Sequence, residues 1–180
     1  IRISNSEIQT FKKCRRKWWL SYYRRLKKQD VDLTGPLAFG SRIHLALDIH
    51  YTTDEPLLDV WRRLVEADRV LAVMGGYNLI EYDNEADLGR IMLEGYLEWN
   101  AEEGIDDNLE IISTEQRLIV PLMDNRVELM AKLDMRVRRK SDNVRLYRDW
   151  KTAASFADFI RTSHMSEQML TYLLIEILQY

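Results

Sequence analysis

Asp134, Asp149 and Lys151 have the side-chain types that phosphodiester hydrolysis requires. Asp149 and Lys151 are two positions apart, and such positions face the same way in a strand. Carboxylate oxygens are natural ligands of Mg²⁺ or Mn²⁺, and a neighbouring lysine can orient or deprotonate a water. The three residues therefore predict a metal-dependent hydrolytic site, with Asp149 and Lys151 on one face of a strand close to its end.

An Asp-x-Lys pattern also arises as an ordinary surface ion pair, which contributes under about 1 kcal/mol. The pattern by itself favours that simpler interpretation. The elements around Asp134, Asp149 and Lys151, and the other motifs that accompany them, must decide between the two.

Period-two patterning in the second half of the chain predicts a meander of three antiparallel strands and then a helix. We expect strands at residues 110–122, 129–137 and 144–151, turns at 124–125 and 141–143, and a helix at 163–179. In the second strand one face is apolar, comprising Leu129, Ala131, Leu133, Met135 and Val137. Asp134 is expected on the opposite face, where it could approach Asp149 and Lys151.

Apolar residues spaced by three and four predict helices in the first half of the chain. Ser4-Asn5-Ser6-Glu7 resembles a capping box and opens a helix that continues to about Tyr22. Further helices are expected at 39–51, after Pro56 and at 84–102, the last with Leu88, Ile91, Met92, Tyr96 and Trp99 on its buried face. We therefore expect one α/β domain, with a mainly helical part at 1–103 and a catalytic part at 110–180.

The charge of the chain is unevenly distributed. Residues 1–28 contain ten Lys/Arg and one acid, whereas the remainder contains 16 basic and 28 acidic residues. A basic end on an acidic body favours a polyanionic partner for that end. Arg15, Arg16 and Lys17 are candidate contacts to a DNA backbone, which would position DNA without reading its sequence. Trp18 is expected in the core. The alternative for the basic residues is that they form an ordinary solvated face of the helix.

Composition excludes several classes of protein. No window approaches 18 consecutive apolar residues, so no membrane span or membrane partner is expected. The beginning of the chain lacks the apolar stretch of a signal peptide. A single cysteine, Cys14, cannot form an internal disulfide and favours a reducing, cytoplasmic setting.

Four short motifs occur in a fixed order along the chain. They are Gly40-Ser41-Arg42-Ile43-His44, Ala131-Lys132-Leu133-Asp134, Arg148-Asp149-Trp150-Lys151-Thr152 and Gln168-Met169-Leu170-Thr171-Tyr172. Together with the basic segment from Ser4 to Tyr23, they resemble the RecB-like branch of the PD-(D/E)XK nuclease superfamily. That branch includes the nuclease domains of bacterial recombination helicases, CRISPR-adaptation nucleases and phage exonucleases.

The resemblance implies a restriction-endonuclease-like core and a role for each motif. His44, Asp134, Asp149 and the backbone carbonyl of Trp150 would hold Mg²⁺ or Mn²⁺, and Lys151 would position or activate the attacking water. Gln168 and Tyr172 are i, i+4 neighbours on one helix face. They would lie near the DNA backbone or support the site. Glu115 matches a position where some superfamily members carry a further acid.

The resemblance also raises two points about cofactor and length. Some relatives combine a cysteine at the position of Cys14 with three later ones to hold an iron–sulfur cluster, which a single cysteine cannot do. The family core has another strand after the Gln-x-x-x-Tyr helix. We therefore expect the final core strand to be missing from this chain.

The resulting hypothesis is a Mg²⁺- or Mn²⁺-dependent deoxyribonuclease, an exonuclease acting on DNA ends rather than a sequence-specific endonuclease. The resemblance places it in recombination, repair or phage DNA metabolism in a bacterial or phage-infected cell, with a helicase or recombinase as a possible partner. Two alternatives stay open: a non-catalytic DNA-binding or assembly module that keeps the fold, and a hydrolase of RNA or nucleotides.

Overall fold

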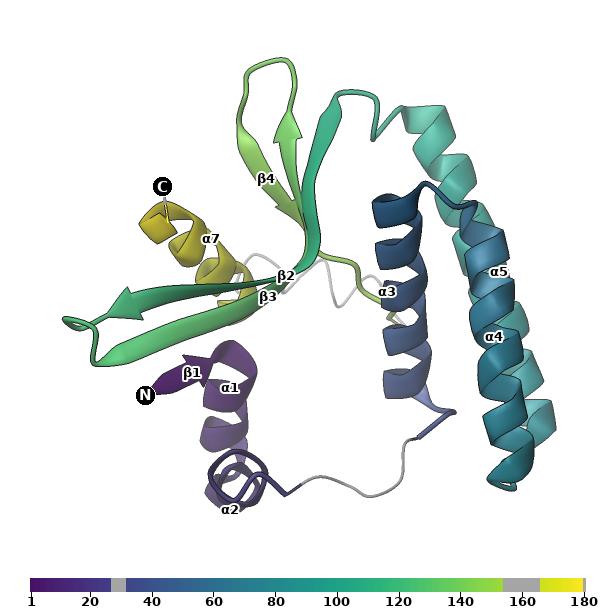
Figure 1. Ribbon diagram of the computed structural model, residues 1–180, viewed down its shortest axis with the longest axis horizontal. Helices are drawn as coiled ribbons and strands as arrows, with labels where there is room; N and C mark the ends of the chain where they lie inside the picture. Colours follow the sequence, from purple (N-terminus) through teal and green to yellow (C-terminus); the bar gives the residue numbers. More distant parts are fainter. Residues whose placement is uncertain (27–31, 154–165, 180) are drawn as a thin grey trace. The chain divides into compact units, whose positions relative to one another are not determined.

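The computed structural model describes residues 1–26, 32–153 and 166–179. Over these residues the chain is α/β, as predicted, with six α-helices, one π-helix and a mixed sheet of four strands (Figure 1). The helices are α1 (Asn5–Lys13), α2 (Arg15–Trp18), the π-helix η1 (Trp19–Tyr23), α3 (Pro36–Thr53), α4 (Leu57–Met74), α5 (Leu79–Glu103) and α7 (Glu167–Gln179). The strands are β1 (Arg2–Ser4), β2 (Leu109–Leu122), β3 (Val127–Arg139) and β4 (Arg145–Arg148).

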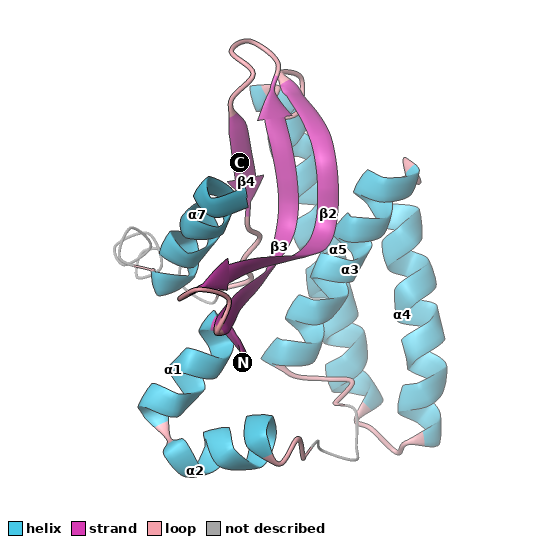
Figure 2. Ribbon diagram, turned by 60° about the vertical axis from the view of Figure 1, so that its left-hand side comes forward, coloured by secondary structure: helices cyan, strands magenta, loops and turns pink. Residues whose placement is uncertain are grey.

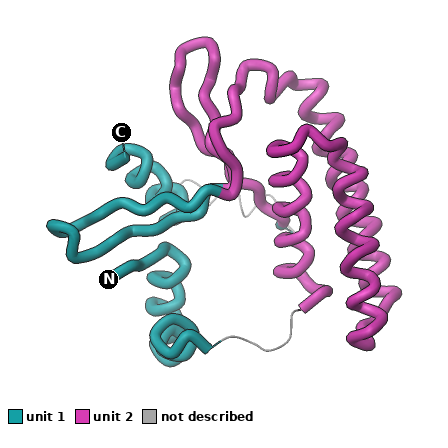
Figure 3. Tube along the Cα trace, in the orientation of Figure 1, with its two compact units in different colours: residues 1–30, 116–133, 153–180 teal, residues 31–115, 134–152 magenta. Residues whose placement is uncertain are grey.

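The chain divides into two units, coloured separately in Figure 3. Unit 1 contains residues 1–30, 116–133 and 153–180, and unit 2 contains residues 31–115 and 134–152. Strands β2 and β3 each contribute to both units. Each unit therefore draws on both the N-terminal half and the C-terminal half of the chain.

Strand β3 is the centre of the sheet (Figure 2). It lies next to β2. It pairs in parallel with β1, where Arg2 is opposite Glu128, and antiparallel with β4, where Met135 is opposite Arg148. The prediction of a three-strand antiparallel sheet was therefore incomplete. The three residues of β1 are too few to show a period of two, so the parallel strand gave no sequence signal.

The predicted apolar face of β3 is confirmed. Its five alternating side chains are at most 6% exposed: Leu129, Ala131, Leu133, Met135 and Val137. On the opposite face Asp134 is 8% and Arg136 is 3% exposed, so this part of β3 is covered on both sides. The alternation predicted which way each side chain points, but it did not predict that the polar face is also buried.

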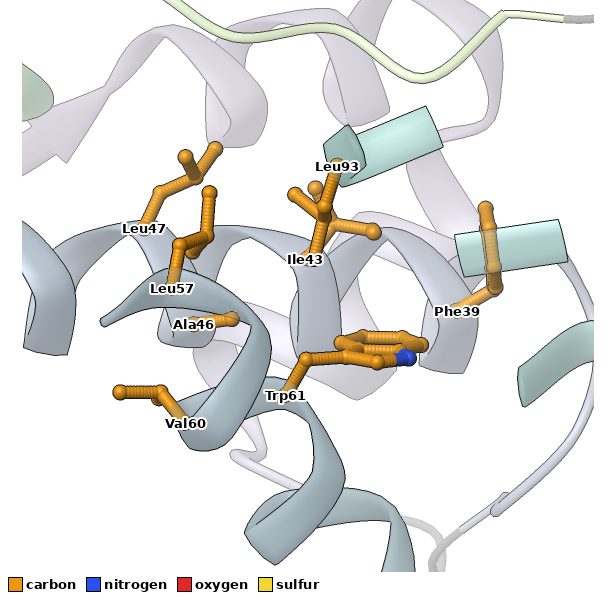
Figure 4. Packing of buried hydrophobic residues seen from close by; sticks show 8 residues of the cluster. All are labelled: Phe39, Ile43, Ala46, Leu47, Leu57, Val60, Trp61 and Leu93. Atoms are coloured by element: carbon orange, nitrogen blue, oxygen red, sulfur yellow. The ribbon is translucent and has the colours of Figure 1, made fainter. Parts of the chain in front are cut away.

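Three helices, α3, α4 and α5, pack side by side in unit 2 (Figure 1). Their core consists of eight side chains, drawn in Figure 4: Phe39, Ile43, Ala46, Leu47, Leu57, Val60, Trp61 and Leu93. Helix α3 is longer than the predicted 39–51, because Pro36 suits a first helical turn and Asp54, at φ 60°, ends the helix. The core residues of α3 recur at spacings of three and four, which aligns one face of this helix with α4.

The prediction for α5 was wrong about both its start and its buried face. The helix begins at Leu79 instead of residue 84, because the Asn78 side chain accepts hydrogen bonds from the backbone N–H groups of Ile80 and Glu81. Three of the residues expected to be buried are about half exposed, namely Leu88, Ile91 and Trp99. The side that packs carries Tyr82, Gly89 and Leu93. A glycine at the tightest contact gives no hydrophobic signal in the sequence.

The predicted continuous helix from Ser4 to Tyr22 is interrupted. Ser4 caps α1 as expected, accepting a hydrogen bond from the N–H of Glu7, but Cys14 adopts an extended conformation. The Cys14 Sγ accepts a hydrogen bond from the N–H of Lys17 and so caps a new helix, α2. Trp18 is half-buried and does not belong to the core.

The last helix, α7, begins at Glu167; residues 163–165 of the predicted helix lie outside the described residues. Four of its predicted apolar residues are 41–66% exposed: Leu170, Leu173, Leu174 and Ile177. The buried side chains are Tyr172 and Ile175. The apolar residues of α7 occupy more than one face, so their spacing alone could not identify the packed one.

The close approach of α4 and α5 depends on Gly89. A Cβ atom at Gly89 would lie 2.2 Å from Cζ2 of Trp61, whose indole N–H donates to the backbone oxygen of Ala86. We expect Gly89→Ala to lower the free energy of unfolding by about 1–3 kcal/mol through overpacking. Gly95→Ala, where nothing lies within 4 Å, should raise it by up to about 1 kcal/mol.

Chemical denaturation of both variants, followed by circular dichroism, measures the two changes. Gly95→Ala is the matched control, because it makes the same substitution on the same helix. Equal effects in the two variants would contradict the proposed α4–α5 contact.

Candidate active site

Three ligand-type side chains converge in unit 2, each from a different element. His44 comes from α3, Glu115 from β2 and Asp134 from β3. The His44 Nδ1 atom lies 3.4 Å from Oδ2 of Asp134 and 3.9 Å from Oε1 of Glu115. One donor atom from each residue lies within 4.8 Å of the other two, which is close enough for all three to contact one cation.

Glu115 reaches this cluster from an irregular position in its strand. Its φ of 47° lies in the left-handed region, which is uncommon for residues other than glycine, asparagine and aspartate. A local departure of this kind re-aims a side chain, and such departures are concentrated near active sites. The sequence pattern of β2 gives no sign of the irregularity, so only the family resemblance pointed to Glu115.

Asp134 is a buried carboxylate with compensating partners. Burial alone would raise its pKa, but the hydrogen bond and charge of His44, the backbone N–H of Trp150 and the charge of Lys151 lower it below the ordinary value. The Trp150 N–H donates to Oδ2 of Asp134 at 3.0 Å. Asp134 is therefore held as an anion, the protonation state that a metal ligand requires.

Asp149 and Lys151 meet each other, although not as residues of a strand. Strand β4 ends at Arg148, so the predicted strand at 144–151 was too long and strand alternation does not orient these side chains. The Lys151 Nζ atom lies 2.6 Å from Oδ2 of Asp149. Burial raises the pKa of Asp149 above its ordinary value despite the opposing effect of Lys151, so the carboxylate depends on the ammonium for its charge.

The ring of Trp150 connects the site to the helical part of unit 2. It stacks on Tyr51 with ring centroids 5.8 Å apart, and it meets the His44 ring edge to face at 6.2 Å. Trp150 also packs against the core cluster of α3, α4 and α5. Because Trp150 separates Asp149 from Lys151, the position of its ring fixes the segment that carries both residues.

Tyr51, whose ring stacks on Trp150, belongs to a polar network that the sequence did not predict. The Asp106 carboxylate accepts hydrogen bonds from the Tyr51 hydroxyl at 2.6 Å and from the Asn100 amide at 2.7 Å, and lies 2.7 Å from the Arg148 guanidinium. The hydroxyls of Tyr51 and Tyr96 also contact each other. These residues come from three separate stretches of the sequence and form no recognisable motif, so only the fold brings them together.

The donor set suits a divalent cation such as Mg²⁺ or Mn²⁺. His44 offers an imidazole nitrogen, which suits first-row transition metals, and Glu115 and Asp134 offer carboxylate oxygens, which suit Mg²⁺ and Mn²⁺. The chemistry of the three residues therefore fits a divalent metal ion. Asp149 and the backbone carbonyl of Trp150, expected as further ligands, stay predictions.

Comparison with known proteins identifies the family. The family model of the PD-(D/E)XK nuclease superfamily matches residues 2–175. The chain belongs to the PD-(D/E)XK nuclease superfamily. This membership implies metal-dependent nuclease activity, and a nuclease fold implies a nucleic-acid substrate. No curated protein matches the chain.

The Gln-x-x-x-Tyr motif of this nuclease lies in unit 1. The Gln168 side-chain amide donates to the Tyr172 hydroxyl, which in turn donates to the backbone oxygen of Lys132 at 3.0 Å. Lys132 precedes Asp134 by two residues in β3. The motif thus holds α7 against the strand that continues into the metal cluster, and its role toward DNA stays a prediction.

The basic residues predicted to contact DNA are accessible to a ligand. Arg15, Arg16 and Lys17 are the exposed first three residues of α2, and the Arg15 guanidinium lies over the ring of Phe11. Cys14 is an exposed free thiol. None of the described helices of the nuclease is both long enough and apolar enough to span a membrane.

The network around Asp106 predicts how stability depends on pH. Burial would raise the pKa of Asp106, but Tyr51, Arg148 and Asn100 lower it below the ordinary 3.8. A lowered pKa contributes stability that is present above pH 3.8 and is lost as the pH falls through the folded-state pKa. We expect Asp106→Asn to destabilise the protein by about 1–3 kcal/mol at neutral pH, because Arg148 loses its ion pair and keeps only its hydrogen bonds to the hydroxyls of Tyr51 and Tyr96.

Urea titrations of both proteins between neutral and strongly acidic pH measure this dependence. The difference in the free energy of unfolding should shrink as the pH falls from 3.8 through the lower folded-state pKa, at which the folded wild type also loses the carboxylate. A difference that stays constant over the whole range would argue against the network.

The convergence of His44, Glu115 and Asp134 predicts a loss of cation affinity when His44 is removed. We expect His44→Ala to weaken binding of Mn²⁺ by at least about tenfold, as measured by isothermal titration calorimetry, because one of three donors is lost. His50→Ala is the matched control, since His50 lies on the same helix with Nδ1 at the backbone oxygen of Glu55. Equal affinities for both variants would place the cation elsewhere.

Proposed function

We propose that this superfamily member is a Mg²⁺- or Mn²⁺-dependent deoxyribonuclease of the RecB-like branch that degrades DNA from its ends. The observation that carries the proposal is the convergence of His44, Glu115 and Asp134 in the unit that also holds the Asp149–Lys151 pair. These side chains combine a cation site with a positioned ammonium. Metal-dependent hydrolysis of a phosphodiester can use both, the cation to activate water and polarise the phosphate and the ammonium to offset its charge.

Each residue of the pair and the cluster has a distinct proposed role. His44, Asp134 and Asp149, joined by Glu115, would hold the cation, which stabilises negative charge on the scissile phosphate when bound. Lys151 would orient the attacking water and offset charge on the phosphate. The Asp149 carboxylate keeps the Lys151 ammonium in place, because the two groups are only 2.6 Å apart.

The motif resemblance and the basic charge of the N-terminal segment support the proposed biological setting. The motif order resembles nucleases of recombination and phage DNA metabolism, which supports action on DNA ends in the cytoplasm of a bacterial or phage-infected cell. The exposed basic residues of α2, Arg15 to Lys17, support contacts to the DNA backbone. The same resemblance supports a helicase or recombinase as the partner.

A purely DNA-binding role is less well supported. Burying a carboxylate is costly unless it is compensated, and binding to a DNA backbone requires no buried acids. The site contains two of them, Asp134 and Asp149, next to a lysine. Buried ionisable groups with shifted pKa values are typical of sites where such groups take part in a reaction.

The nuclease assay tests the proposal directly. End-labelled linear DNA and closed circular DNA are incubated with Mn²⁺, with Mg²⁺ or with a chelator. We expect metal-dependent cleavage of linear DNA only, and a loss of at least about hundredfold in Lys151→Ala and Asp149→Ala with DNA binding retained. Lys140→Ala is the control, because Lys140 is an exposed lysine of the same unit that contacts the backbone oxygen of Asp107.

Two results would count against this function. Cleavage that persists in the chelator would exclude a metal-dependent site. Wild-type activity in both Lys151→Ala and Asp149→Ala would remove the pair from the reaction. Cleavage of circular DNA at a comparable rate would instead keep the nuclease and exclude the preference for ends.

A further inference from the structure

Two aromatic side chains of η1 are exposed and stacked on each other. Trp19 is 41% and Tyr23 is 69% exposed. Their ring centroids lie 6.4 Å apart with an angle of 17° between the ring planes. Large aromatic groups contribute most to stability when they are buried, so an exposed pair that is already stacked suggests contact with another planar group.

Packing within unit 1 does not explain Trp19. The neighbouring Trp18 makes the internal contacts of this segment: its indole N–H donates to Oε1 of Glu7 at 2.9 Å, and its ring meets Phe11 edge to face at 5.2 Å. Trp18 is half-buried as a result, whereas Trp19 is exposed. Two adjacent tryptophans are thus used differently, one to hold the segment and the other to face outward.

The surroundings of the exposed pair are strongly basic. Residues 12–25 contain seven Lys/Arg and no acid. The Arg24 guanidinium lies over the Trp19 ring, 5.1 Å from its centroid, and the Arg15 guanidinium lies over the Phe11 ring at 5.4 Å. The surface therefore combines aromatic faces with cations held beside them, which is the combination that binds nucleic-acid bases and their phosphates together.

The backbone beneath the pair is also unusual. Residues 19–23 form a π-helix, in which the N–H of Arg24 donates to the carbonyl of Trp19. Turns of this type are rare and are frequently found at functional sites. The conformation is consistent with a surface shaped for a ligand, although it does not by itself specify which one.

We propose that Trp19 and Tyr23 form a stacking platform for the unpaired bases of single-stranded DNA. This inference rests on the proposed deoxyribonuclease function and specifies the form of its substrate. Every base has a π-face on which such rings can stack, whereas the bases of a duplex are already stacked on each other. Arg24, with Arg15 to Lys17, would contact the phosphates. The platform would therefore engage a single-stranded overhang, without preference for its sequence.

An anionic membrane is the competing partner for a basic aromatic surface. Interfacial segments are amphipathic helices whose apolar face lies along the membrane. Here α1 and α2 are separated by the extended residue Cys14, and the ring of Trp18 is held inside unit 1. These features favour DNA over a membrane. Binding to phosphatidylserine vesicles distinguishes the two partners.

Binding of two oligonucleotides by fluorescence anisotropy tests the platform. One is oligothymidylate of about 12 nucleotides, and the other is an abasic strand of the same length, which retains the phosphates but has no bases. Both are measured in a chelator so that cleavage plays no part. We expect the wild type to bind oligothymidylate more tightly by about tenfold or more, and Trp19→Ala/Tyr23→Ala to bind both strands about equally.

Three control variants make the test specific to stacking. Trp19→Phe/Tyr23→Phe should retain most of the preference, because both rings are kept. Trp99→Ala removes another tryptophan of similar exposure, 48%, from α5 and should leave the preference unchanged. Lys140→Ala removes an exposed lysine of unit 2, outside both the platform and the candidate active site, and should bind like the wild type.

The outcome is independent of the nuclease assay. If Trp19→Ala/Tyr23→Ala keeps the wild-type ratio between the two strands, the platform is excluded even for an active nuclease. If the ratio falls to about one, the platform is supported even for a chain that cleaves no DNA. If that variant loses binding to phosphatidylserine vesicles while its DNA ratio is unchanged, the surface binds membranes and the proposal is wrong.

Discussion

The buried carboxylate of Asp134 imposes a requirement that much of unit 2 satisfies. An ionised group with 8% exposure is unfavourable unless neighbouring groups replace its hydration. Its neighbours are the His44 imidazole, the Trp150 backbone N–H and the charge of Lys151. His44 depends on α3, and Trp150 and Lys151 depend on the segment after β4. The helical and the sheet portions of the unit must therefore both be in place before this anion can be accommodated.

The segment that carries Asp149 and Lys151 lacks the support of regular secondary structure. Strand β4 ends at Arg148, so backbone pairing with β3 does not extend through these residues. Side chains hold the segment instead. Trp150 stacks on Tyr51, and the Arg148 guanidinium pairs with Asp106. This explains why polar residues from α3 and α5, which bear no resemblance to a catalytic motif, gather beside the site: they take over the positioning that a longer strand would have provided.

The sequence was most informative where a single period governs a whole element. The alternation in β3 correctly predicted its buried face and the direction of Asp134, because each strand position has only two possible orientations. It was least informative where packing is decided by a residue with no hydrophobic signal. Gly89 brings α5 against Trp61 and turns Leu88 and Ile91 outward. No local pattern predicted the interruption at Cys14 either, because the helical spacing of apolar residues continues across it.

The candidate site was likewise predicted only in part from the sequence. Asp134, Asp149 and Lys151 were chosen for their chemistry and spacing, and the structure does place Asp149 against Lys151, although strand alternation was the wrong reason. Glu115 is in the cluster because of a local irregularity in β2, and irregular backbone is what periodic patterns cannot represent. The contacts around Asp106 join segments separated by up to 55 residues, so their pairing depends on the complete fold.

The two buried aspartates have opposite electrostatic environments, and this suggests a division of labour. The pKa of Asp134 is lowered and that of Asp149 is raised. Asp134 thus stays ionised by virtue of groups fixed in the fold, whereas the ionisation of Asp149 depends on Lys151. Carboxylates whose pKa values are driven apart commonly have different roles. Removing Lys151 would raise the pKa of Asp149 further, as well as removing an ammonium. The two residues consequently act as a unit, and the effects of substituting them separately should not add.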